Sequence, residues 1–157
     1  MREILFRGKR KSDNEWIDGY YVQVEDFLDD KRHNLIFEID SVAYPDNEIV
    51  GSNGICPNTL GQYTGSTDKN GVKIFEGDIL SCDDYPYTSD GNQNYYAEIV
   101  WLDENAAFGL YTFKNPMSKV RGVSEGCDYI DDFTSDVWEV IGNIYDNPEL
   151  LGGDSDE

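Results

Sequence analysis

The stretch TLGQYTG (residues 59–65), followed at once by DKNG (68–71) and IFEGDIL (74–80), decides the fold. Asn-Gly is the dipeptide that best tolerates positive φ at both central positions of a type I′ turn. We therefore predict that residues 60–64 and 72–75 form a short hairpin around DKNG. The EGD of the third segment predicts a second sharp bend, which leads into another strand.

Strand-like patterns extend along most of the chain. Aromatic, β-branched and alternating residues predict further strands over residues 3–8, 16–24, 35–39, 79–82, 95–102, 108–113 and 137–145. The first two form an opening hairpin around SDN (12–14), and Gly19 is expected to break the second strand. Residues 25–34 resemble an exposed loop or a single helical turn. The proline of NPELL (147–151) predicts one closing helical turn.

These elements predict a mainly β fold with little helix: a small SH3-like barrel with an N-terminal hairpin and an extended insertion. A chain of 157 residues fits one ordinary domain or one small barrel with an insertion. We predict an N-terminal hairpin and extended segment over residues 1–58, in which 41–58 is an extended connection. The barrel core then covers 59–151. The acidic tail 152–157 has no apolar anchor and is expected to be disordered.

The chain is strongly acidic. It carries 12 basic and 32 acidic residues, for a formal net charge of -20, yet 13% of its residues are aromatic, so it should fold rather than stay disordered. Such a surface repels nucleic acid and anionic lipid and attracts cationic partners. The basic segment 1–11 is expected to edge a strand or pair with neighbouring carboxylates.

The residue types needed for most catalytic and metal chemistry are scarce. His33 is the only histidine, which leaves no histidine for a nucleophile relay or a multi-histidine zinc centre. Three cysteines without a C-x-x-C pair indicate reduced thiols, and a calcium loop starting at Ser66 fails because its twelfth position is Gly77. We predict no enzyme activity, no catalytic residues and no bound cofactor or metal. One alternative stays open, weak binding of a divalent cation at Asp83-Asp84 or Asp131-Asp132.

Three blocks of sequence resemble a known family. They are ILFRGK (4–9) with the nearby Trp16, GQYTG (61–65) with the DKNG and EGDI motifs, and VIGNIYDNPELL (140–151). In this order they are similar to the YopX family of phage and prophage proteins. The resemblance implies a phage-encoded, mainly β protein that forms oligomers, without an established family activity. Longer segments around 25–58 and 83–94 and the extra acidity depart from the pattern.

Charge and resemblance together favour a binding protein. We expect an accessory protein that binds and inhibits a cationic, nucleic-acid-binding bacterial defence or replication protein, by presenting carboxylates where phosphates would lie. Aromatic rings between the carboxylates would act as anchors. The candidate contacts are Asp26, Asp29, Asp30, Asp83, Asp84, Tyr85, Tyr87, Asp128, Tyr129, Asp131, Asp132 and Asp136.

Two other classes of function remain. The protein could be a homo-oligomeric structural or assembly component of a phage, whose acidity only keeps it soluble. It could also sequester a signalling nucleotide, although the overall negative field disfavours this. Direct contact with nucleic acid or membrane is not expected. No apolar run approaches the roughly 18 residues that a membrane span needs, so we expect a cytoplasmic protein of the bacterial host cell.

Overall fold

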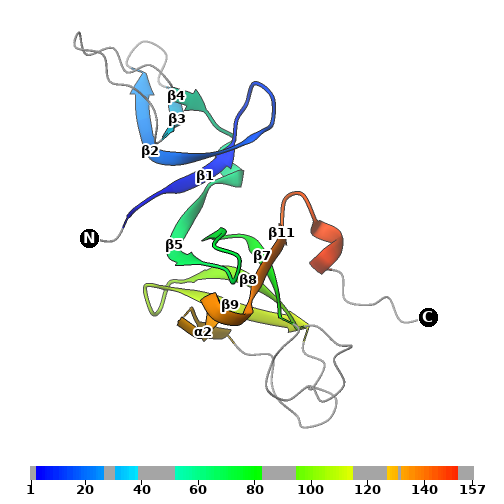
Figure 1. Cartoon of the computed structure of the whole chain (residues 1–157). Coiled ribbons are helices and arrows are strands. Elements are labelled where there is room, and N and C mark those ends of the chain that lie inside the picture. The colour runs from blue at the N-terminus through cyan, green and yellow to red at the C-terminus, as the bar shows by residue number, and fades with distance from the viewer. Residues whose placement is uncertain are drawn as a thin grey trace, which may run out of the picture. The chain divides into compact units, whose positions relative to one another are not determined.

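The computed structural model describes residues 3–26, 31–38, 52–82, 95–114, 127–130 and 132–151. The chain forms two compact units, Met1–Tyr63 and Thr64–Glu157. Antiparallel strands make up most of both units (Figure 1). The division between the units falls inside one long strand, β5.

A six-stranded antiparallel sheet has the order β4-β3-β2-β1-β5-β6. Its strands are β1 (Phe6–Lys9), β2 (Trp16–Asp26), β3 (Lys31–Glu38), β4 (Ser52–Gly54), β5 (Gly61–Thr67) and β6 (Lys73–Phe75), and the 3-10 helix η1 (Pro57–Thr59) precedes β5. In the first unit, Ile17, Ile36 and Ile55 form a buried cluster on one face of this sheet. The apolar residues of alternate strand positions therefore supply the core, as their period predicts.

Gly19 does not break β2, contrary to the prediction. It pairs with Phe6 on one side and with Glu38 on the other. A Cβ atom at this position would lie 2.0 Å from the carbonyl oxygen of Phe37. The missing side chain therefore lets β3 approach closely, which is a common reason for glycine inside a strand.

The predicted loop over residues 25–34 is wrong at both of its ends. The β2–β3 ladder continues as far as the pair Asp26↔Lys31, and within this segment residues 27–30 lie outside the described part of the chain. Glu25 and Arg32 are directly opposite each other, and their side chains form an ion pair of 3.0 Å. The polar composition of this segment indicated a loop. Opposite charges paired across the two strands stabilise it as a strand instead.

The DKNG segment makes a hairpin turn, but not the predicted type I′. The Gly71 amide donates to the Asp68 carbonyl, and Gly71 has a φ of 82° whereas Asn70 has no positive φ. The Asp68 carboxylate accepts hydrogen bonds from the amides of Asn70 (2.8 Å) and Val72 (2.9 Å). An aspartate that bonds the following amides favours a type I turn with a left-handed glycine after it.

The second unit is built on a five-stranded antiparallel sheet of order β10-β9-β8-β7-β11. Its elements are β7 (Asp78–Cys82), β8 (Tyr95–Leu102), β9 (Ala107–Lys114), β10 (Cys127–Tyr129), the helix α2 (Asp132–Val137), β11 (Glu139–Asn143) and the 3-10 helix η2 (Pro148–Leu151). The core cluster contains Leu80, Ala97, Ile99, Leu110 and Trp138. Strands β7, β8 and β9 lie side by side (Figure 1).

The mainly β class is confirmed, but the sheets do not close into the predicted barrel. Among the described residues, each sheet ends in an edge strand, and the edge strands β4, β6 and β10 have three residues each. Edges this short offer few backbone groups for closure. The predicted strand 137–145 is also corrected, because residues 132–137 are helical and the strand covers only 139–143.

Candidate functional site: an acidic unit with an aromatic sheet face

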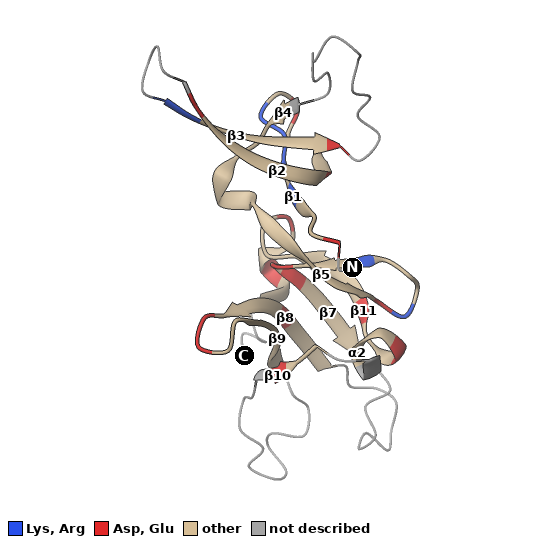
Figure 2. Cartoon of the chain, turned by 90° about the vertical axis from the view of Figure 1, so that its left-hand side faces the viewer, with Lys and Arg blue, Asp and Glu red and all other residues tan. Residues whose placement is uncertain are grey.

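Negative charge is concentrated in the second unit. Residues 64–157 hold 5 of the basic and 20 of the acidic side chains, a formal charge of -15, whereas residues 1–63 hold 7 and 12, a charge of -5. Figure 2 shows acidic segments of the second unit at the turn between β8 and β9 and on α2. The exposed carboxylates of these segments include Asp103, Glu104 and Asp136. Most of the formal negative charge therefore belongs to the second unit.

Most of the predicted contacts cannot be placed. Asp29, Asp30, Asp83, Asp84, Tyr85, Tyr87 and Asp131 lie outside the described residues. The backbone of Asp26 ends β2, and that of Asp132 begins α2. Asp128, Tyr129 and Asp136 are described and exposed.

Strand β10 separates two of the predicted contacts onto opposite faces of the sheet. Asp128 pairs with Leu110, which belongs to the core cluster, and Tyr129 pairs with Gly109. Consecutive strand residues point to opposite sides. Asp128 therefore lies at the sheet edge on the core side, while Tyr129 is 56% exposed on the other side.

This other side of the five-stranded sheet, which we call the open face, presents a half-buried carboxylate among aromatic rings. On β8, Tyr95, Ala97 and Ile99 are buried in the core, so Tyr96 and Glu98 between them lie on the open face. Over β8, β9 and β10 the open face includes Tyr96, Glu98, Val100, Tyr111, Phe113 and Tyr129, and over β7 and β11 it continues to the buried Ile79 and Ser81 and to Glu139.

Strand registers define the neighbours of Glu98 on the open face. Glu98 lies directly opposite Tyr111 of β9 on one side and Ile79 of β7 on the other. The rings of Tyr96 and Phe113 stack with their centroids 6.3 Å apart and an interplanar angle of 19°. Opposed strand residues have Cβ atoms about 5 Å apart, so the Tyr111 ring is within reach of the Glu98 side chain.

Burial raises the pKa of the Glu98 carboxyl above its ordinary value. Desolvation disfavours the charged form, and among the described side chains no cation offsets it. Within the described segments, the Glu98 carboxylate has neither a hydrogen-bond donor nor an ion-pair partner. Sequence reasoning missed this residue, although the alternation in YYAEIVWL (95–102) contained the signal.

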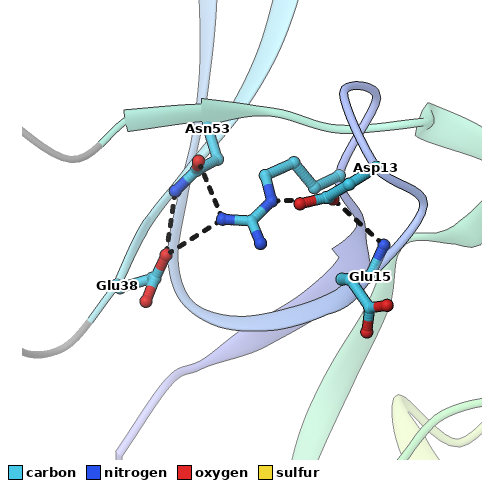
Figure 3. A network of polar contacts seen from close by, with 5 residues as sticks. Asp13, Glu15, Glu38 and Asn53 are labelled. Atoms are coloured by element: carbon cyan, nitrogen blue, oxygen red, sulfur yellow. Dashed lines mark hydrogen bonds and ion pairs between the residues drawn. The ribbon is translucent and has the colours of Figure 1, made fainter.

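In the first unit, a polar network joins the β1–β2 turn to the ends of β3 and β4 (Figure 3). The Arg10 guanidinium contacts Asp13 at 2.9 Å, Asn53 at 3.4 Å and Glu38 at 3.8 Å. The hydrogen bond from Arg10 lowers the pKa of the Asp13 carboxyl. The prediction that the basic segment pairs with carboxylates is confirmed for Arg10, whose role here is structural.

No group of three or more His, Cys, Asp or Glu residues that could hold a metal ion occurs in the described ranges. The candidate cation positions at Asp83-Asp84 and Asp131-Asp132 lie outside those ranges, apart from the backbone of Asp132. Within the part of the chain that the structure describes, no helix is both long and apolar enough to cross a membrane.

The fold and this surface define a class of mainly β proteins with two open antiparallel sheets and a strongly acidic second unit. The YopX family model, described as YopX protein, matches residues 5–152, so the chain belongs to the YopX family. The crystal structure of protein EF1440 from Enterococcus faecalis is similar, with a TM-score of 0.55 and 24% identity over 97% of this chain and 100% of that one. This likeness shows the fold alone. No curated protein matches the sequence.

Proposed function

We propose that this YopX-family protein is a phage-encoded, non-enzymatic accessory protein of the bacterial cytoplasm. In this proposal it captures and inhibits a cationic, nucleic-acid-binding bacterial protein of defence or replication. The observation that carries the proposal is the formal charge of -15 on the second unit. Exposed carboxylates on strand ends, turns and a helix of one compact unit can occupy the phosphate-binding groups of such a partner.

In binding of this kind, long-range attraction and short-range contact come from different groups of the protein. The negative field raises the rate of encounter with a basic protein, and salt weakens that field over about 8 Å at physiological ionic strength. Exposed rings such as Tyr129 and Tyr111 supply the contact area that carboxylates lack. Aromatic residues inside a polar rim are frequent centres of binding energy.

The test compares two variants that lose the same charge in different units. The first neutralises exposed carboxylates of the second unit, Glu104→Gln, Asp128→Asn and Asp136→Asn. The second neutralises exposed carboxylates of the first unit, Glu3→Gln, Glu15→Gln and Glu25→Gln. Each variant is used to capture proteins from a bacterial lysate at about 50 mM and about 500 mM salt, with mass spectrometry of the bound proteins.

We expect the wild type to retain a basic nucleic-acid-binding protein at low salt only. The second-unit variant should lose most of this capture, and the first-unit variant should keep it. Equal loss in the two variants would mean that only net charge matters. Capture that neither salt nor either variant changes would contradict the proposal.

A second candidate, a homo-oligomeric assembly component, is favoured by an apolar surface of the first unit. Tyr20, Val22 and Val24 alternate on the face of β2 opposite the buried isoleucines, and they are 51%, 40% and 43% exposed. Apolar neighbours on one sheet face are typical of a contact surface. Light scattering after size exclusion tests it: a stable oligomer that Val22→Thr with Val24→Thr dissociates supports assembly, and a monomer at all concentrations contradicts it.

A further inference from the structure

The open face carries a specific recognition feature. Glu98 is half-buried and has no ion-pair partner among the side chains that the structure describes, and it lies in a unit with few basic residues. A carboxylate that is partly removed from water without a partner costs free energy in the isolated protein. A cation supplied from outside would recover part of that cost on binding.

The surroundings of Glu98 decide which cation fits. A metal ion requires several oxygen ligands, and no group of three or more His, Cys, Asp or Glu residues that could supply them occurs among the described residues. The residues around it are instead aromatic, and Tyr111 and Tyr129 keep 37% and 56% of their surface exposed. A planar guanidinium can pair with a carboxylate through two N–H groups and also stack on aromatic rings, whereas an ammonium group is a compact, strongly hydrated charge.

We propose that the open face binds an arginine side chain of a protein partner, with the guanidinium paired to Glu98 and packed against Tyr111 or Tyr129. This inference rests on the proposed function and narrows it, because it names the partner group that one site accepts. The other carboxylates of the second unit attract basic proteins in general. Glu98 and the rings select an arginine among the cations so attracted.

Over β9 and β10 the open face is accessible, with Tyr111 and Tyr129 exposed, whereas at β7 it ends at Ile79 and Ser81, which lie opposite Glu98 and Tyr96 and are buried. Strand β10 has only three residues and forms one edge of the sheet, so the open face ends beside Tyr129. Gly109, which pairs with both Val100 and Tyr129, contributes no side chain between them. A long arginine side chain can therefore lie flat over this position and reach towards Glu98.

The test uses the full chain and a small probe, so that no host protein is needed. N-acetyl-arginine methylamide is titrated into labelled protein, and the carboxyl resonance of Glu98 and the amides of 96–100 and 109–113 are followed by NMR. The matched probe is N-acetyl-lysine methylamide. The variants are Glu98→Gln and, as control for the same change in charge, Glu15→Gln at an exposed position of the first unit.

We expect weak, saturable binding of the arginine probe, with a fall in the pKa of Glu98 when the probe is bound. Glu98→Gln should weaken this binding by about tenfold, Glu15→Gln should change it less than about twofold, and the lysine probe should bind at least about fivefold more weakly. The two amide spectra of the variants report whether the fold is intact.

Equal binding of arginine and lysine, or equal affinity of Glu98→Gln and wild type, would overturn the inference. Capture of basic proteins from lysate by Glu98→Gln at the wild-type level would remove Glu98 from the proposed function but leave that function standing. Arginine binding at Glu98 without any salt-sensitive capture from lysate would support the inference about Glu98 and contradict the proposed function.

Discussion

The Asp68 carboxylate connects a turn to a strand residue that is 72 positions away in the sequence. Removing this carboxylate should break the connection. Asp68 is 3% exposed. Its Oδ1 accepts hydrogen bonds from the amides of Asn70 and Val72, and its Oδ2 accepts one of 2.9 Å from the amide of Val140. We predict that Asp68→Ala destabilises the second unit strongly and that Asp68→Asn does so less.

The expected loss of unfolding free energy follows from how each of the three amide donors is satisfied after the substitution. Asn70 and Val72 lie in an exposed turn, where water can replace the carboxylate, so each lost bond should cost about 0.5–1 kcal/mol. The Val140 amide is less accessible, and an unsatisfied donor of this kind costs about 1–3 kcal/mol. We therefore expect a loss of about 3 kcal/mol for Asp68→Ala. Asp68→Asn keeps one oxygen for the turn but turns an NH2 group towards an N–H donor, at about 1–2 kcal/mol.

The assay combines urea unfolding with amide hydrogen exchange. Trp138 is 2% exposed and its carbonyl accepts a hydrogen bond from the Lys69 amide, so its fluorescence reports on the same region. Exchange of the Val140 amide reports on the bond itself. As control, Glu104→Ala at an exposed position should change the unfolding free energy by less than about 0.5 kcal/mol. A loss below about 1 kcal/mol for Asp68→Ala, with unchanged protection of Val140, would refute the reasoning.

Two further perturbations follow from burial and close approach. Burial raises the pKa of Glu98 in the folded state above its value in the unfolded state. Between these two pKa values the folded protein binds more protons than the unfolded protein, so the contribution of Glu98 to stability falls as the pH rises through this window. Glu98→Gln should remove that decline, and the melting temperature at pH about 4 and about 7, relative to wild type, measures it. Gly19→Ala would place a Cβ atom 2.0 Å from the Phe37 carbonyl oxygen and should cost about 2–3 kcal/mol, whereas Gly54→Ala, whose nearest contact is 3.9 Å, should cost less than about 1. Equal urea midpoints for the two glycine variants would contradict this account.

Local patterns predicted the strands well where one face is buried and one is not. The strand Tyr95–Leu102 was predicted with the bounds that the structure has, because its alternate residues enter a core. The turn type at DKNG was mispredicted, because a side chain, Asp68, competes with the Asn-Gly preference for positive φ. The segment around Glu25 was predicted to be a loop because its composition is polar. The ion pair that stabilises it as a strand is made with Arg32 across the hairpin, and a local pattern does not contain such a contact.

Barrel closure and the binding surface depend on contacts that no local pattern contains. Sheet order decides that β10 and β11 form the two edges of the second sheet. The adjacent acids were predicted as contacts because they are numerous in the sequence. Glu98, in contrast, is a single acid among tyrosine, alanine, isoleucine and valine. Only the pairing of β8 with β9 shows that Glu98 faces Tyr111.

The most direct test of the central claim is the footprint of a captured basic partner on this protein, measured by hydrogen–deuterium exchange of the free and bound protein. The account predicts that protection on binding is concentrated in the second unit, in peptides that contain residues 96–113 and 127–136, and that it disappears at high salt. Protection confined to the first unit, or protection that persists unchanged at high salt, would contradict it.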